Sequence, residues 1–265
     1  MKKKLSLAVL LASAPVLAAA ANDPWDSPFT LQLGAFSAKA DTTVRLDSEI
    51  GGGIGTSVSF EGDLGIADSK TVPQFDFLWR INPRHAIEGS YISLERSGTR
   101  TLSGQINWGE VSFPVNTAVD SSFDTDTLRV AYRWSPINND GNELALLLGL
   151  HYTKMKASIT SSGGVLADEA SVDYPLPTIG ARASARIADN WRVTGFGQFL
   201  KLKIDEYDGE LVNLGVALEW AFSRSAFAGL GYNYYRYKLT SEKANARGEF
   251  DFTFDGPQLY AGWSF

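Results

Sequence analysis

Apolar and polar residues alternate along most of the chain, which is the pattern of β-strands with two unlike faces. The clearest case lies at 143–156, where Leu144, Leu146 and Leu148 alternate with Ala145 and Gly149. The pattern predicts ten strands, at about 29–37, 72–81, 86–96, 124–135, 143–156, 176–187, 191–204, 211–222, 226–240 and 247–265. We therefore expect an all-β chain.

The connections between these segments differ in length in a regular way. Short turns follow the second, fourth, sixth and eighth segments, at 82–84, 138–141, 189–190 and 223–225. Long connections follow the first, third, fifth and ninth, and a modest one follows the seventh. Short periplasmic turns and long extracellular loops are typical of transmembrane antiparallel up-and-down β-barrels, whose strands need roughly 9–11 residues. We expect about ten strands. Eight or twelve also fit the pattern, because 56–60 and 106–115 could pair as additional hairpins or as extensions above the membrane.

The character of the two faces favours a membrane barrel over a soluble sandwich or a lipocalin-like barrel. In a soluble barrel the apolar face would point inward. Here the opposite face carries glycine, serine, threonine, asparagine and charged residues, which suits an enclosed polar lumen. On that assignment Leu146, Leu214 and Leu218 contact lipid.

Tryptophans gather next to the short turns and the C-terminus, where they predict an aromatic girdle at the periplasmic interface. The five residues are Trp79, Trp134, Trp191, Trp220 and Trp263. Tyrosines such as Tyr91 and Tyr152 mark the other end of the strands. Lys154, Lys156 and Lys201 lie near them, at the height expected for lipid phosphates.

The two ends of the chain carry export and assembly signals. Lys2 to Lys4 followed by an apolar run and small residues predict a cleaved signal peptide at 1–20, with one barrel domain at 21–265. The last segment alternates strictly and ends on an aromatic residue, as in the insertion signal of bacterial outer-membrane barrels. Its outward residues are Leu259, Ala261, Trp263 and Phe265.

Composition excludes several classes of function. The formal net charge is −6, and falls to −9 once the three signal lysines are removed, which argues against nucleic-acid binding. The chain has no cysteine, so disulfides, zinc–cysteine sites and thiol catalysis are excluded. No cofactor is expected.

Charged residues on the inward face lie near the periplasmic end of their strands. They are Asp76, Arg80, Glu88, Arg129, Arg133, Glu143, Arg182, Arg186, Glu219 and, least surely, Arg192. An anion-selective passage is one interpretation. A salt-bridged plug is the favoured one, because barrels of about eight strands hold only side chains and buried charges must be paired.

Catalytic and metal sites find little support. The chain has two histidines, His85 in a short turn and His151 on an inward face, and neither has a Gly-x-Ser-x-Gly context. No catalytic residue is assigned. Acidic clusters at Glu61–Asp68, Asp168–Glu169 and Asp205–Glu210 could take divalent cations, but solvated loops are favoured.

The signal peptide, the terminal Trp263–Phe265, the alternating strands and the tryptophan girdle together resemble the small outer-membrane β-barrel proteins of Gram-negative bacteria. The resemblance implies an outer-membrane location, with membrane lipid, lipopolysaccharide, the barrel-assembly machinery and an extracellular ligand as partners. A structural or surface-interaction role through the extracellular loops is favoured. The alternatives are a narrow channel or carrier, with Phe36, Leu147, Phe227 and Tyr235 lining an apolar route, and a lipid-modifying enzyme.

Overall fold

The computed structural model describes residues 23–47, 53–204, 207–243 and 246–265, so the expected signal peptide at 1–20 lies outside the described residues. None of the described residues forms a helix that could cross a membrane. Thirteen strands are present in these residues: β1 Phe29–Leu46, β2 Ser57–Ser59, β3 Ser69–Asn82, β4 His85–Thr101, β5 Ile106–Trp108, β6 Val111–Phe113, β7 Ala118–Asn139, β8 Asn142–Ser161, β9 Ala167–Ala188, β10 Trp191–Ile204, β11 Tyr207–Ser223, β12 Ala226–Lys243 and β13 Ala246–Ser264.

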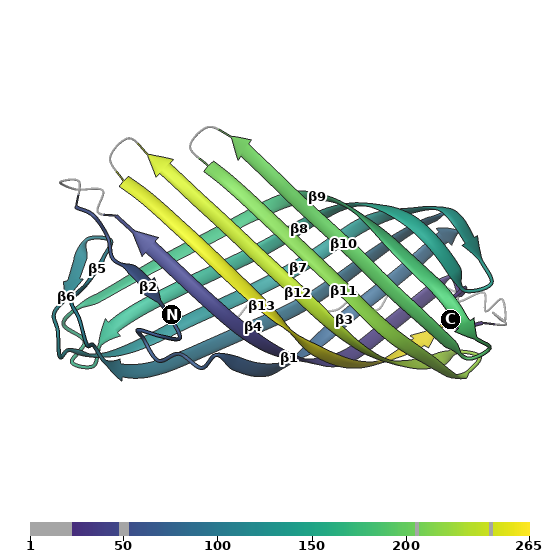
Figure 1. Cartoon of the computed structure of the whole chain (residues 1–265), viewed down its shortest axis with the longest axis horizontal. Coiled ribbons are helices and arrows are strands. Elements are labelled where there is room, and N and C mark those ends of the chain that lie inside the picture. The colour runs from purple at the N-terminus through teal and green to yellow at the C-terminus, as the bar shows by residue number, and fades with distance from the viewer. Residues whose placement is uncertain (1–22, 48–52, 205–206, 244–245) are drawn as a thin grey trace, which may run out of the picture.

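Ten of these strands are long, and they form a closed antiparallel ring (Figure 1). Each pairs with the next long strand along the chain, and β13 pairs back onto β1 from Thr30–Ser264 to Leu46–Gly248. Because β13 closes the ring, no open sheet edge faces the membrane beside it. The prediction of an up-and-down barrel with about ten strands is confirmed.

Four two-residue turns join strands at one end of the barrel, where the sequence predicted them. The turn between β7 and β8 consists of Asp140 and Gly141, whose φ angles are 49° and 78°. A type I′ hairpin turn requires positive φ at both central positions, which aspartate and glycine tolerate well. Local turn chemistry therefore fixes the register of this hairpin.

The connections at the opposite end show how the structure departs from the expected loop lengths. Two of them are long: β1 joins β3 through β2, and β4 joins β7 through the β5–β6 hairpin. The β8–β9 connection covers only 162–166, and β12 ends three residues before β13 begins. These connections are short because the strands themselves continue beyond the predicted ends.

Half-way along the strands the polarity of each face changes, although the same alternate positions continue to point outward. On β8, Leu144 to Tyr152 expose every second side chain as a large apolar residue, but Lys154 and Lys156 follow on the same face. The inward face changes in the opposite sense, from Gly149 and His151 to Met155 and Ile159. We call Asn142–Tyr152 and its neighbours the membrane half, and Thr153–Ser161 and its neighbours the outer half.

The outward face of the membrane half is an apolar belt. Leu146, Leu214 and Leu218 are 53%, 46% and 40% exposed, and large apolar residues of the neighbouring strands surround them. Water-soluble monomers rarely expose contiguous apolar patches of more than a few hundred Å². The belt is therefore the surface that lies in lipid.

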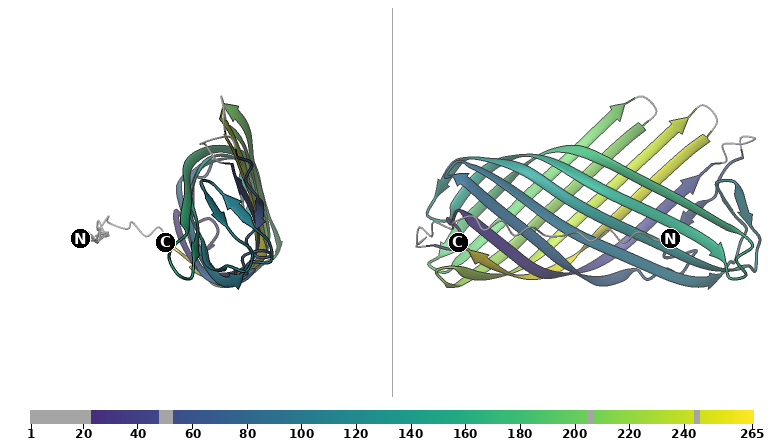
Figure 2. Two further views of the ribbon diagram at one scale, coloured as in Figure 1. Left: turned by 90° about the vertical axis from the view of Figure 1, so that its left-hand side faces the viewer. Right: turned by 180° about the vertical axis from the view of Figure 1, so that it is seen from behind.

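The outer half is built like a soluble β-sandwich. Its interior is a packed apolar cluster in which Phe60, Trp108, Phe113 and Phe123 are fully buried. The long connections supply Phe60, Trp108 and Phe113, so these segments fill the barrel from within. Seen end-on, the barrel is oblong rather than round (Figure 2).

Candidate functional site: the filled lumen

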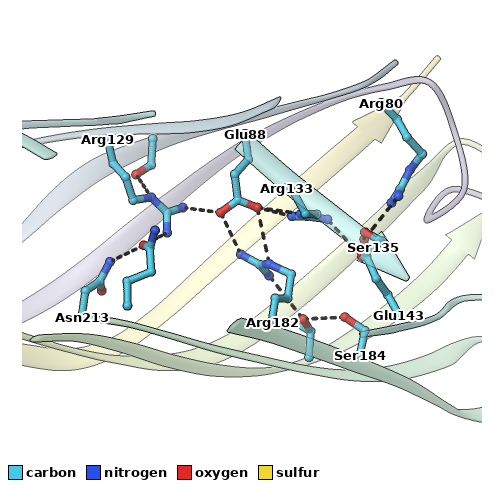
Figure 3. A network of polar contacts seen from close by, with 12 residues as sticks. Arg80, Glu88, Arg129, Arg133, Ser135, Glu143, Arg182, Ser184 and Asn213 are labelled. Atoms are coloured by element: carbon cyan, nitrogen blue, oxygen red, sulfur yellow. Dashed lines mark hydrogen bonds and ion pairs between the residues drawn. The ribbon is translucent and has the colours of Figure 1, made fainter. Parts of the chain in front are cut away.

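The polar interior of the membrane half centres on Glu88 of β4. Its carboxylate binds Nε of Arg133 at 2.9 Å, Nε of Arg182 at 3.4 Å and Nη2 of Arg129 at 3.6 Å. Glu88 is only 3% exposed, and the three arginines come from β7 and β9 (Figure 3). One carboxylate therefore ties three strands together across the lumen.

Glu143 of β8 is the second acidic centre of this network. It accepts hydrogen bonds from Nη1 of Arg133 at 3.0 Å, from Nη1 of Arg80 at 3.4 Å and from Oγ of Ser135 at 2.5 Å. Arg133 thus bridges Glu88 and Glu143 (Figure 3). Buried charges need such partners, because removal of one member of a buried pair leaves a costly unpaired ion.

Neutral polar groups extend the network toward the opposite wall. Arg129 donates to Oε1 of Gln198 at 3.0 Å and to Oγ of Ser90 at 3.1 Å. The Phe196 ring lies 5.1 Å from the guanidinium carbon of Arg129 and 4.9 Å from that of Arg182. The arginines are therefore held by hydrogen bonds, ion pairs and an aromatic face.

Trp25 closes the end of the lumen beside the short turns. Its side chain is buried, with the residue 3% exposed, and the guanidinium carbons of Arg186 and Arg192 lie 5.1 Å and 4.9 Å from the ring centroid. Its carbonyl accepts a hydrogen bond from Arg80 at 3.3 Å. The segment that precedes β1 is thereby folded into the mouth of the lumen beside the short turns.

A further ion pair lies beside this tryptophan. Arg192 donates from Nε to Oε2 of Glu219 at 2.7 Å, and Tyr260 donates to the other oxygen of the same carboxylate at 2.7 Å. The structure also places Asp76 on the lumen side, where Gln74 donates to it at 2.9 Å. All the charges assigned inward from sequence thus lie on the lumen side of the membrane half or at its mouth.

The side chains of the network leave a cavity in the lumen. A cavity of about 140 Å³ lies among polar residues that include Gln32, Asn213 and Asn233. The cavity is wide enough for water molecules, and its polar lining offers them hydrogen-bond partners. Above it, Tyr235 stacks on Phe254 with ring centroids 4.7 Å apart, and the apolar core of the outer half begins.

Three of the four residues named for an apolar route, Phe36, Phe227 and Tyr235, line the lumen cavity. Phe36, Leu147, Phe227 and Tyr235 are each at most 5% exposed. Phe36 and Tyr235 belong to the core of the outer half, and Phe227 packs with Trp25. Leu147 is not among the residues that line this cavity, so the four residues do not form one continuous wall.

The girdle and insertion residues lie on the outside of the barrel. All five girdle tryptophans are between 40% and 51% exposed, and the rings of Trp191 and Trp220 stack with centroids 6.3 Å apart. Leu259, Ala261 and Trp263 pair with β1, and Phe265 exchanges two backbone hydrogen bonds with Phe29. The terminal strand thus completes the ring.

The two histidines have an amide and a tyrosine hydroxyl as hydrogen-bond partners. His151 is 1% exposed, and its Nε2 lies 3.3 Å from Oε1 of Gln198. Ser184 donates to Thr194 instead, at 2.9 Å. His85 contacts the hydroxyl of Tyr132 on the outer surface.

The acidic clusters have structural partners where they are described. Glu61 pairs with Arg96 and accepts hydrogen bonds from Thr42, and Glu169 pairs with Lys156 at 2.9 Å. Part of 205–210 lies outside the described residues. No group of three or more potential metal ligands occurs in the described part of the chain.

Sequence reasoning missed Trp25, Gln198 and Ser135. Trp25 precedes the first strand, so no alternating pattern indicated that its side chain points inward. Gln198 lies between Gly197 and Phe199 on β10. Because Gly195 and Gly197 carry no side chain, the alternation there did not indicate which residues point inward. Ser135 is the last inward residue before the turn, and its spacing of two from Arg133 could have identified it.

Comparison with known proteins supports the fold. No protein-family model matches the chain, and no curated protein matches its sequence. The outer-membrane protease OmpT from Escherichia coli matches with a TM-score of 0.60 and 11% identity, over 89% of this chain and 96% of that one. At this identity the match shows the fold alone.

Two further solved structures are similar at lower scores. OprG from Pseudomonas aeruginosa has a TM-score of 0.41 and 10% identity, over 92% of this chain and 99% of that one. Ail of Yersinia pestis has a TM-score of 0.31 and 12% identity, over 88% and 99%. With its closed ring and apolar belt, this chain has the fold of an outer-membrane β-barrel.

Proposed function

We propose that the protein is a closed barrel that carries its outer half as a rigid platform for contacts at the cell surface. The observation that carries the proposal is the filled interior. Ion pairs occupy the membrane half, and the apolar cluster around Phe60 and Trp108 occupies the outer half. A channel needs a continuous aqueous path, and barrels of about eight strands enclose little more than their own side chains.

Contacts between the long connections support the platform. Thr56 and Asn107 exchange hydrogen bonds of 2.8 and 3.0 Å, and the Gly109 amide donates to the carbonyl of Leu46 at 3.3 Å. On the other side, Ser162 donates to the carbonyl of Ala118 at 2.8 Å. Loops that are fixed in this way present a preformed surface, which lowers the entropy cost of binding.

Lipopolysaccharide is the first surface partner that we propose. Lys154 and Lys156 lie directly above Tyr152, at the height where the phosphates of the outer leaflet are expected. The test uses purified protein in nanodiscs and purified lipopolysaccharide. Substitution of both lysines with glutamate should weaken binding several-fold. Unchanged binding would remove this partner while leaving the closed barrel intact.

We further propose that the protein is not an enzyme, although OmpT is a protease. His151 is enclosed in the lumen, and His85 lies at a periplasmic turn, so neither reaches the outer half. The test incubates the purified barrel with peptides and with outer-membrane lipids and analyses the products by mass spectrometry. Product formation that disappears in His151→Ala would contradict the proposal.

We propose that the final strand is the signal that the barrel-assembly machinery recognises. Leu259, Trp263 and Phe265 form its outward face and remain exposed in the folded ring. Deletion of Phe265 should lower the amount of folded protein in the outer membrane. The readout is the difference in gel migration between heated and unheated membranes, and an unchanged amount would argue against the signal.

The measurement that tests closure is solute flux. Proteoliposomes that contain the barrel should not swell in isosmotic sugar, whereas those with a general porin should swell rapidly. Swelling at the porin rate would show an open path and overturn the proposal.

A further inference from the structure

A short segment before β1, residues 23–28, folds on itself at the mouth of the lumen beside the short turns. The Asp23 carboxylate accepts a hydrogen bond from the Trp25 amide at 2.9 Å, and the Asp23 carbonyl accepts one from the Ser27 hydroxyl at 3.3 Å. Both bonds lie within the segment, so it keeps its shape without a neighbouring strand. We call these residues the mouth segment.

Side chains of the ring, rather than a strand ladder, hold the mouth segment in place. The contacts are those of Ser264 with the Pro24 carbonyl at 2.6 Å, of Arg80 with the Trp25 carbonyl at 3.3 Å, and of Arg186 with the Asp23 carboxylate as an ion pair. One backbone hydrogen bond, from Arg80 to the Pro28 carbonyl at 2.7 Å, marks the end next to β1. The segment can therefore swing away about Pro28 while the strands stay paired.

The mouth segment forms the wall of the lumen cavity at this end. Pro24 and Trp25 line the cavity together with residues of the ring such as Gln32 and Asn213. The Trp25 ring packs in a small apolar cluster with Phe227, apart from the large core of the outer half. Movement of the ring away from this position therefore opens the cavity and leaves that core intact.

The closed position leaves one polar group of Trp25 without a partner. The residue is 3% exposed, and its indole N–H makes no hydrogen bond with any described residue. Buried tryptophan N–H groups usually have a hydrogen-bond partner, and a buried donor without one costs free energy. Water satisfies this donor once the segment swings out. The unpaired N–H thus lowers the free-energy difference between the closed and the open position.

We propose that the mouth segment is a lid, which opens the lumen cavity to small polar molecules at the mouth beside the short turns. The outer half stays closed in both positions, because its core residues Phe60, Trp108 and Phe123 take no part in holding the lid. The cavity is then a chamber with a single entrance, on the periplasmic side in the orientation expected from the sequence. This inference rests on the closed barrel proposed above, and the tests distinguish the two.

Reactivity of a single thiol in the cavity tests the lid, because the natural chain has no cysteine. Gln32→Cys places the thiol in the cavity, and Ser97→Cys places it on the exposed face of β4 as a control. The reagent is a small, water-soluble methanethiosulfonate, applied to folded protein in nanodiscs. Trp25→Ala should raise the labelling rate of Gln32→Cys tenfold or more and leave that of Ser97→Cys unchanged. Trp79→Ala, which removes an outer tryptophan, should change neither rate.

The second variant weakens the closed position without removing the tryptophan. Asp23→Asn abolishes the ion pair with Arg186 but keeps an oxygen acceptor for the Trp25 amide. Opening should become more frequent, so labelling of Gln32→Cys should rise several-fold. Asp26→Asn is the matched control, because Asp26 is exposed on the same segment, and it should leave the rate unchanged. Heat-modifiable gel migration verifies that each variant is folded.

Three results would overturn the proposal. Fast labelling of Gln32→Cys without any change to the lid would show that the segment seals nothing. A rise in neither lid variant, or in Trp25→Ala alone, would make the segment a fixed wall. Conductance steps in Trp25→Ala would contradict the closed outer half, and with it the single entrance. Raised labelling in both variants with a flat current is the result that the lid predicts.

Discussion

Two nitrogen atoms of Arg133 bind a single oxygen of Glu88, with Nε at 2.9 Å and Nη2 also in contact. The remaining Nη1 of Arg133 binds Glu143. One guanidinium therefore joins two buried carboxylates on β4 and β8, and both lose a partner if it is removed.

Replacement of Arg133 with methionine should strongly destabilise the barrel. Two carboxylates would remain in the lumen without their shared cation, and loss of one partner of a buried pair costs about 3–5 kcal/mol. Arg236→Met is the matched control, since Arg236 pairs with Asp251 at the surface and such pairs contribute about 1 kcal/mol or less. Urea unfolding in detergent micelles measures both; equal losses would contradict a structural role for the network.

The stability of the outer half should depend on Trp108 of the β5–β6 hairpin. Trp108 is fully buried against Phe60, with ring centroids 5.6 Å apart. Trp108→Ala should cost about 3–5 kcal/mol, because it leaves a cavity in a packed core. Trp79→Ala removes a half-exposed ring from the girdle and should cost clearly less. The comparison uses thermal unfolding, and the reverse order would show that the hairpin is not part of the core.

The change along β8 from a lipid-facing to a water-facing outer surface can be tested with one substitution in each half. Leu146→Arg places a charge in the lipid belt and should cost about 2–4 kcal/mol. Thr160→Arg lies on the same outward face in the outer half and should change stability by about 0.5 kcal/mol or less. Folding titrations into lipid vesicles give both values. Similar costs at both positions would place the outer half in lipid.

Acidification should loosen the start of the first long connection. Asp47 accepts hydrogen bonds from Arg45 and from the Gly55 amide, each at 2.9 Å, and the Arg45 hydrogen bond lowers the pKa of Asp47 below its usual value. A lowered pKa means that this stabilisation is present above the usual pKa and is lost as the pH falls through the lowered value. Hydrogen exchange should show Gly55 losing protection in acid. Asp47→Asn should abolish that pH dependence; its persistence would assign it to another group.

Sequence alternation predicted the membrane half well and the outer half poorly. The interpretation required apolar residues on one constant face, and it therefore began β7 only at Asp124 and β9 only at Leu176. In the structure the facing continues, but the polarity of each face is exchanged at about Thr127 and Tyr152. The strands therefore run several residues further than predicted, as at Ala118 and Ala167.

The lumen network could be predicted only in part. Residues two apart on a strand point to the same side, so the sequence identified which charged residues point inward. Their pairing did not follow, because Glu88 meets arginines that are distant in sequence and brought together only by closure of the ring. The contacts of Trp25 with Arg186 and Arg192 have the same origin.

The central claim is that side chains close the barrel, so that no continuous aqueous path crosses it. Single-channel recording in planar lipid bilayers tests it most directly, with purified, folded protein and a general porin as the positive control. The account predicts a flat current for the natural chain at moderate voltage. Reproducible, discrete conductance steps that scale with the amount of folded protein would contradict it.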